Sequence, residues 1–325
     1  MPHPLPELPS AHDAIDGLVY FPRMLGKIRL HAVGKLPQVY VPYLGDAPQF
    51  GGHVFDARCC RLLGVSYADL VAKTHELPTD AAVLEWARAT GKNPTAEQTE
   101  IWSAYASKRG WRDDATPSMR EWAVKLGADP DAVLTWFDGF DIDEGRKTPS
   151  DFKPESFPPG PVASAKPEKS PTVIPGLPSP YEKIDGVVYF PRMVTKIALA
   201  AAGKLPQEWI ASCGYAGNDP AIAKNFDSLC CRFLGIDYAA IQAKVLAGET
   251  DPSVLLAWAF ATSPRGARPS DEEITVWNAF MTKRGWRDPL YQRLAFRLDD
   301  SGYPAGAVAV MFDYIDIDEG RPVRG

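Results

Sequence analysis

The feature that most constrains this chain is an internal repeat that runs through most of its 325 residues. The segment IDGLVYFPRM at 15–24 returns as IDGVVYFPRM at 184–193, and KRGWRD at 108–113 returns at 283–288. The shorter segments GKLPQ, CCR and DIDEGR also return, in the same order. Two copies are too few for a solenoid, which needs at least three stacked repeats. The chain is therefore a tandem duplication of one unit.

The repeat divides the chain into four parts. Residues 15–146 and 181–325 are the two predicted copies, and residues 1–14 are predicted to be a flexible N-terminus. The segment 147–180 holds ten prolines among Ser, Lys and Glu. Such a composition predicts an extended or disordered linker, because it offers little apolar surface to bury. The sequence leaves open whether the two copies pack on each other.

Helix start and stop signals predict a mainly α fold with about six or seven helices in each copy. Thr95 with Gln98 matches a capping box, and Ser270 with Glu273 repeats it in the second copy. Further starts are expected at Pro22, Ser66, Thr79, Thr116-Pro117 and Asp129-Pro130. The segment GLVYF is the one candidate for a short strand.

Composition and charge exclude several classes of protein. The formal net charge of −6 argues against a general nucleic-acid binder and against binding to anionic membranes. No run of about 18 apolar residues predicts a transmembrane helix, and the first residues do not resemble a signal peptide. Five cysteines in two adjacent pairs and a singlet do not suggest a disulfide framework. We expect a reduced, cytoplasmic protein without a cofactor.

An arginine follows the Phe-Pro pair that opens the first expected helix of each copy. Arg23 and Arg192 would lie in the first helical turn, where the helix dipole disfavours a cation by about 0.3–1 kcal/mol. Free N–H groups beside a guanidinium form a good anion site. The anion is either a carboxylate of the same copy or a bound ligand, for which Tyr20 and Tyr189 would be further contacts.

An acidic cluster, which includes the repeated DIDEGR segment, lies at the end of each copy and places negative charge where a helix dipole disfavours it. Its members are expected at the C-terminal end of the last helix, where the dipole disfavours anions. One explanation is a network with arginines of the same copy, and a weaker one is an oxygen-ligated divalent metal. The metal candidates are Asp138, Asp141, Asp143, Asp313, Asp316 and Asp318.

The KRGWRD segment is typical of the C-terminal end of a helix. Gly110 would take the left-handed position after the helix, with Trp111 packing back onto it. The alternative is that Arg112, and Arg287 in the second copy, face a ligand from a loop.

The Cys-Cys-Arg segment is the strongest chemical motif of the chain. A thiolate would be favoured by a helix N-terminus and by the neighbouring Arg61 or Arg232, whereas cysteines that only pack in a core are common. Asp56 and Asp227 precede the pairs and are either helix N-caps or part of a site. The catalytic candidates are Cys59, Cys60, Cys230, Cys231, Asp56 and Asp227.

Four of these motifs, taken in order, resemble the bacterial family known as domain of unknown function 5069. The resemblance covers nearly all of 15–146 and 184–321. It implies a compact helical domain and carries no catalytic residues with it.

Three functions remain open on the sequence. The leading hypothesis is a small anionic ligand bound by Arg23, Arg192, Arg61 and Arg232, with the Cys pairs and Asp56 and Asp227 lining the same pocket. The second is an enzyme with a Cys or Asp active group. The third is a non-catalytic, bivalent interaction module, which would need an exposed apolar patch on each copy.

Overall fold

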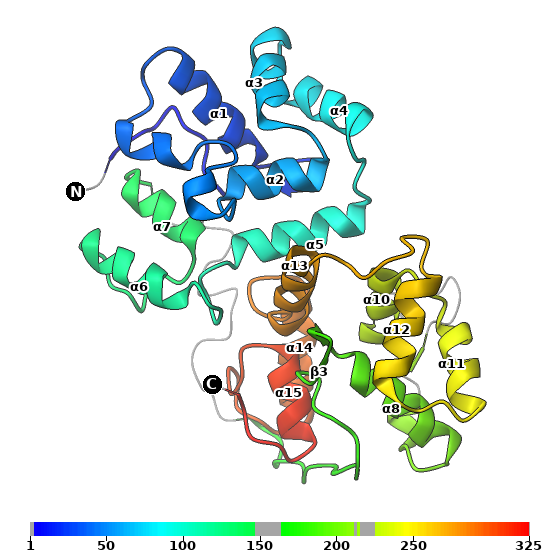
Figure 1. The fold of residues 1–325 in the computed structure, drawn as a ribbon. Helices are drawn as coiled ribbons and strands as arrows, with labels where there is room; N and C mark the ends of the chain where they lie inside the picture. Colours follow the sequence, from blue (N-terminus) through cyan, green and yellow to red (C-terminus); the bar gives the residue numbers. More distant parts are fainter. Residues whose placement is uncertain (1–2, 147–163, 211–212, 215–224, 325) are drawn as a thin grey trace. The chain divides into compact units, whose positions relative to one another are not determined.

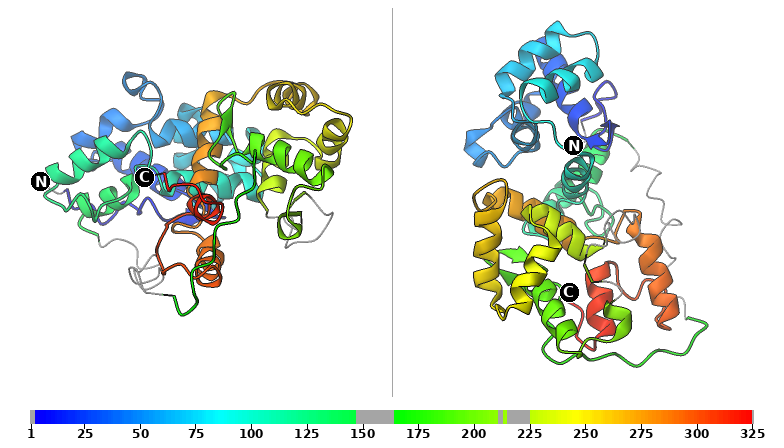
Figure 2. Two further views of the ribbon diagram at one scale, coloured as in Figure 1. Left: turned by 90° about the horizontal axis from the view of Figure 1, so that it is seen from below. Right: turned by 90° about the vertical axis from the view of Figure 1, so that its right-hand side faces the viewer.

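The computed structural model describes residues 3–146, 164–210, 213–214 and 225–324. The chain divides into two compact units, unit 1 (Met1–Lys153) and unit 2 (Pro154–Gly325) (Figure 1). In the two further views of Figure 2, helices joined by loops again make up each unit. The prediction of a duplicated, mainly α-helical chain is confirmed.

Each unit begins with a small hairpin and continues with helices. Unit 1 contains β1 (Ala14–Ile15), β2 (Leu18–Val19), α1 (Phe21–Ala32), η1 (Gln38–Tyr43), η2 (Pro48–Phe50), α2 (Phe55–Leu63), α3 (Tyr67–Glu76), α4 (Asp80–Thr90), α5 (Ala96–Ser107), α6 (Thr116–Lys125) and α7 (Trp136–Asp143). Unit 2 contains β3 (Lys183–Ile184), β4 (Val187–Val188), α8 (Phe190–Ala201), α9 (Gln207–Ile210), α10 (Phe226–Leu234), α11 (Tyr238–Leu246), α12 (Pro252–Thr262), α13 (Asp271–Thr282), α14 (Leu290–Asp300) and α15 (Met311–Asp318).

The hairpin and α1 follow from the repeated IDGLVYFPRM. Asp16 and Gly17 both have positive φ, as a two-residue hairpin turn requires, and β1 pairs with β2. Tyr20 then takes a left-handed conformation, and Pro22 occupies the first helical turn, where a missing N–H costs nothing. Unit 2 repeats this geometry, with Tyr189 at the same bend.

The capping signals predicted most helix starts correctly. Ser66 accepts a hydrogen bond from the Asp69 N–H, and Thr79 caps α4. Both capping boxes are present, at the starts of α5 and α13. The hydroxyl and carboxamide or carboxylate groups satisfy N–H groups that a helix start leaves without a partner.

Two of the expected helix boundaries are wrong. The last helix of unit 1 begins after Thr135, whose side chain caps it, and not at Asp129-Pro130. Asp138 therefore lies in the first turn of α7, where the dipole favours an anion. Gly110 does have positive φ, but α5 ends at Ser107 with Lys108 as its C-cap, so this glycine lies beyond the position expected for it.

The prediction of a flexible N-terminus and a flexible linker is also partly wrong. Leu8 and Ala11 are buried in unit 1, so residues 3–14, the part of this segment that the structure describes, are not a free N-terminus. Residues 164–180 belong to unit 2, where Ile174 and Leu177 pack in a cluster with Leu205. Apolar residues scattered among the prolines supply the buried surface that composition alone did not suggest. The rest of the predicted linker, 147–163, and part of the long stretch 204–225 lie outside the described residues.

The helical core places the acidic C-terminal segment of each unit against its first helix. In unit 1, Phe21, Met24 and Leu25 of α1 are fully buried, and α1 packs on α3. Across the parts of the chain that the structure describes, no helix has the length and apolarity to span a bilayer.

Candidate functional site

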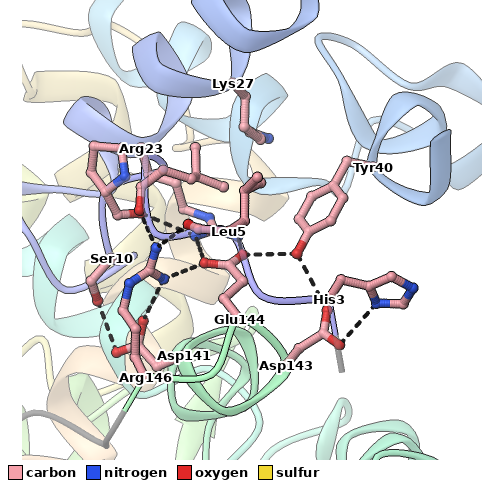
Figure 3. Close-up of polar contacts among 12 residues, drawn as sticks. His3, Leu5, Ser10, Arg23, Lys27, Tyr40, Asp141, Asp143, Glu144 and Arg146 are labelled. Carbon is pink, nitrogen blue, oxygen red and sulfur yellow. Dashed lines mark hydrogen bonds and ion pairs between the residues drawn. The ribbon is translucent and has the colours of Figure 1, made fainter. Parts of the chain in front are cut away.

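A buried ion-pair network joins the two ends of unit 1 (Figure 3). The Arg23 guanidinium donates to both carboxylate oxygens of Glu144, and its Nη1 lies 2.9 Å from Glu144 Oε2. Arg146 also pairs with Glu144 and lies 3.3 Å from Asp141 Oδ1. The side chains of Arg23 and Glu144 are 2% and 0% exposed, so the pair is sealed from solvent. The anion expected beside Arg23 is thus an internal carboxylate.

The network shifts the pKa values of its carboxyl groups in opposite directions. Burial opposes the ionisation of Glu144, but hydrogen bonds and charge from Arg23 and Arg146 outweigh it and lower the pKa of Glu144. Burial is also the largest influence on Asp141, and it raises the pKa of that carboxyl despite the Ser10 hydroxyl and Arg146. Removing one partner of such a buried pair costs about 3–5 kcal/mol. This is several times the dipole penalty on Arg23, so the pairing decides where the arginine lies.

Two further side chains, Tyr40 and His3, bind the carboxylates at the rim of the network. Tyr40 donates its hydroxyl to Glu144 Oε1 at 3.0 Å and lies 3.3 Å from Asp143. His3 Nδ1 is 3.1 Å from the other oxygen of Asp143. The acidic cluster is thereby bound to side chains of its own unit, as the network explanation predicted.

A second buried cluster lies one helical turn along α1. Lys27 Nζ is 2.6 Å from Asp56 Oδ1 and 2.9 Å from the Tyr20 hydroxyl, which itself donates to Asp56 at 2.8 Å. The Gly45 N–H donates to the second oxygen of Asp56. Burial, only partly offset by Asp56, lowers the pKa of Lys27. The prediction that Asp56 caps α2 is wrong, because Val54 is the N-cap and Asp56 lies inside the helix with its carboxylate turned to Lys27.

Unit 2 repeats both clusters. Arg192 is paired with Glu319, and Arg321 lies 3.2 Å from Asp316. Lys196 is 2.7 Å from Asp227, which also accepts from Tyr189. Asp227 is not an N-cap either, since Asn225 caps α10. The partner of the glutamate differs at one position: the indole Nε1 of Trp209 donates to Glu319 at 3.1 Å, in the place that Tyr40 takes in unit 1.

The two cysteine pairs lie in the cores of their units. Cys59 and Cys230 have no exposed surface, and burial raises the pKa of both thiols well above the ordinary value. Burial raises the pKa of Cys60 and of Cys231 to about 12. Thiolates are therefore strongly disfavoured at neutral pH, which supports core packing over nucleophilic catalysis.

The remaining predicted arginines do not gather at these clusters. Arg61 is exposed on α2 and donates to the Gly52 carbonyl, and Arg232 is exposed on α10. Arg112 and Arg287 both have positive φ and stack over the neighbouring tryptophan ring. Among the described residues, no three His, Cys, Asp or Glu side chains lie close enough together to hold a metal ion.

Unit 2 contains a cavity of about 610 Å³ that opens beside the ion network. Its floor includes Tyr189, Arg192, Lys196 and Glu319, which belong to the two buried clusters. Of the ligand contacts predicted in the second copy, Tyr189 and Arg192 line this cavity, whereas Arg232 and Arg287 are absent from its described lining. The cysteines and Asp227 are absent from that lining as well.

Two arginines that the sequence analysis missed form one wall. Arg293 and Arg297 lie one turn apart on α14 and both line the cavity. Residues four apart share a helix face, where two like charges are destabilising. Within the described residues, neither guanidinium has an ion pair of its own. Tyr314, Met311 and Ile315 supply the wall from α15.

The corresponding wall of unit 1 is filled with aromatic rings. The copies align without gaps from Trp111 and Trp286 to their ends. Where unit 2 has Arg297 and Ile315, unit 1 has Trp122 and Phe140, whose ring centroids are 5.7 Å apart. Trp136, the counterpart of Met311, lies 5.3 Å from Trp122.

A glycine makes this ring packing possible. Gly139 stands where unit 2 has Tyr314, and a Cβ atom at Gly139 would come within 2.2 Å of the Trp122 ring. The signal for the cavity was in the sequence, as a run of positions at which the copies differ in size and charge.

Comparison with known families and proteins agrees with the duplication. The profile of a family described as domain of unknown function (DUF5069) matches residues 6–146 and again residues 175–321. No curated protein and no solved structure matches the chain.

Proposed function

Because the chain belongs to the DUF5069 family, as two tandem copies, and the family brings no activity with it, we propose a function from the cavity itself. Unit 2 binds a small anionic ligand in the 610 Å³ cavity between α9, α14 and α15. The observation that carries this proposal is the pair Arg293 and Arg297, which line the cavity and have no ion pair among the described residues. The Arg293 guanidinium also lies 5.4 Å from the centroid of the Phe296 ring. The volume lies in the range of pockets that hold small molecules, about 300–1,000 Å³.

The charges around the cavity support an anion. Its carboxylates are mostly engaged: Glu319 by Arg192 and Arg321, Asp318 by Lys169 at 3.9 Å, and Asp300 by Lys166 at 3.6 Å. Glu208 is exposed at the edge and lacks an ion pair within the described residues. Arg293 and Arg297 therefore leave a surplus of positive charge on the wall.

Arg192 contributes in a different way from the one its motif suggests. Both of its terminal nitrogens already bind Glu319, and Nη1 also donates to the Pro178 carbonyl at 2.8 Å. Arg192 therefore stabilises the floor of the cavity, and the ligand is bound by Arg293 and Arg297 of α14. In unit 1 the same network lies behind rings, so we assign the ligand to unit 2 alone.

The test is isothermal titration of the full chain with inorganic phosphate, citrate and acetate. Arg293→Ser combined with Arg297→Met should weaken the tightest of these complexes by at least about tenfold, because charged hydrogen bonds contribute about 1.5–3 kcal/mol each. The control is Arg120→Met, which removes an exposed arginine from α6 of unit 1 and should leave affinity unchanged. Unaltered binding by the double variant would overturn the proposal.

A bivalent interaction module is the second candidate, on a separate observation. Tyr43 and Phe50 of unit 1 stack with their centroids 4.7 Å apart and are 50% and 39% exposed, and Val39 is exposed beside them in sequence. The corresponding stretch of unit 2 lies largely outside the described residues. Replacing Tyr43 and Phe50 with serine would leave anion titrations unchanged and would reduce self-association or partner binding only under this second function.

A further inference from the structure

The walls of the cavity divide into a charged part and a ring-lined part. Arg293 and Arg297 form the charged part. The ring-lined part contains Trp209, Phe226 and Tyr314. A ligand that only carried charge, such as inorganic phosphate, would leave the second part in contact with water or empty.

Unit 1 shows what this part of the fold accommodates. The positions of Arg297, Met311 and Ile315, which line the cavity of unit 2, are taken in unit 1 by Trp122, Trp136 and Phe140, with ring centroids 5.3–6.3 Å apart. These spacings lie in the range preferred by offset-stacked and edge-to-face rings. The backbone framework around α6 and α7 is thus already suited to flat rings.

We infer that the ligand of unit 2 is an aromatic carboxylate or aromatic phosphate, whose ring packs against Trp209, Phe226 and Tyr314 while its anionic group meets Arg293 and Arg297. This inference rests on the proposed function and adds the chemical class of the ligand. The ring packs beside Trp209, whose indole is oriented by its 3.1 Å hydrogen bond to Glu319. Both ligand types share a flat ring with an attached anionic group. Titration with benzoate and with phenyl phosphate distinguishes a carboxylate from a phosphate.

Matched probes separate the ring from the charge. The full chain is titrated with benzoate, cyclohexanecarboxylate, acetate, phenyl phosphate, inorganic phosphate and benzyl alcohol. Benzoate should bind at least about tenfold more tightly than acetate, because it buries a ring, and about threefold to tenfold more tightly than cyclohexanecarboxylate, because ring–ring contacts favour a flat ring. Phenyl phosphate should exceed inorganic phosphate in the same way, and benzyl alcohol should bind more weakly than either aromatic anion.

Variants of Trp209 locate the ring. Trp209→Leu should remove the preference for benzoate over cyclohexanecarboxylate, while Trp209→Tyr, which installs the residue of unit 1, should retain most of it. Circular dichroism and thermal unfolding of both variants establish that unit 2 stays folded.

The outcomes distinguish the two proposals. If acetate or cyclohexanecarboxylate equals benzoate, or if Trp209→Leu keeps the full preference, the aromatic class is overturned while anion binding stands. If benzoate and phenyl phosphate bind equally to the wild type and to Arg293→Ser with Arg297→Met, the anion contacts are wrong and the proposed function fails with them. If no probe binds, both fail.

Discussion

The two units keep the same buried ion network and differ in the wall beside it. In unit 1 a cluster of aromatic rings around Trp122 lies beside the network. In unit 2 the corresponding region is a cavity lined by Arg297 and Tyr314. The network joins the first helix to the last in both units. The residues beside it can differ between the units because they lie on the surface of α6 in unit 1 and of α14 in unit 2. The comparison teaches that residues kept between the copies form the buried framework, and residues that differ line the proposed binding site.

The largest effect is expected from breaking the shared network. Arg23→Met in unit 1 and Arg192→Met in unit 2 each leave a buried glutamate without its bidentate partner, and each should lower the free energy of unfolding by about 3–5 kcal/mol. Chemical denaturation of the full chain measures this. Arg120→Met is the control, since its exposed pair with Asp131 should contribute less than about 1 kcal/mol. A loss below 1 kcal/mol for either network variant would show that the framework does not depend on the pair.

The ring cluster of unit 1 should tolerate the unit 2 residue poorly. Trp122→Arg removes a partly buried ring that contacts Trp136 and Phe140, and should destabilise unit 1 by about 2–4 kcal/mol through the lost ring contacts and apolar burial. Differential scanning calorimetry of the full chain would record the loss. If Trp122→Arg is as stable as the wild type, the rings of unit 1 are not a packed wall.

Gly139 gives a smaller and sharper test of the same packing. Helix propensity alone would make Gly139→Ala stabilising by up to about 1 kcal/mol, but the new methyl group would meet the Trp122 ring. Overpacking should win, at a net cost of about 1–3 kcal/mol. Combining it with Trp122→Ala in a double-mutant cycle should abolish this penalty, and additive effects would contradict the contact.

Acid should weaken the network through its glutamates. The pKa of Glu144 is lowered in the folded state from an ordinary value of 4.5, and that of Glu319 is lowered likewise. Each therefore contributes stability that is fully present above pH 4.5 and is lost as the pH falls through the folded pKa. Asp141 has a raised pKa and acts in the opposite sense, favouring the folded state more as the pH falls. Denaturation at pH 3–6 should show a shallower acid loss for Glu144→Gln than for the wild type, and equal slopes would refute this assignment.

The sequence predicted the framework because its signals are local. Capping residues such as Ser66 and Thr95 act within one turn, and the repeat identified the duplication directly. The arginine and the acidic cluster were recognised as groups that need counter-charges, and the structure supplies them in Glu144 and Arg146. Thr135 was missed as a helix start because the preceding Asp129-Pro130 offers a stronger signal of the same kind.

The cavity could not be predicted from the sequence because it depends on tertiary packing. The exchange of Trp122 for Arg297 and of Gly139 for Tyr314 reads in one dimension as ordinary drift between copies. Only the packing shows that Trp122 lies over Gly139 in unit 1, whereas Arg297 and Tyr314 line a cavity in unit 2. The motifs that repeat identically in the two copies belong to the framework, whereas the cavity wall lies at positions that differ.

The most direct measurement is a ¹H–¹⁵N spectrum of the tryptophan indoles, assigned through Trp209→Tyr, Trp122→Phe and Trp136→Phe. The anion that binds most tightly in the titrations is added to saturation. The account predicts a large shift of the Trp209 indole, which donates to Glu319 at the cavity, and none at Trp122 or Trp136. Shifts at Trp122 or Trp136 with Trp209 unmoved would place the ligand in unit 1 and contradict the account.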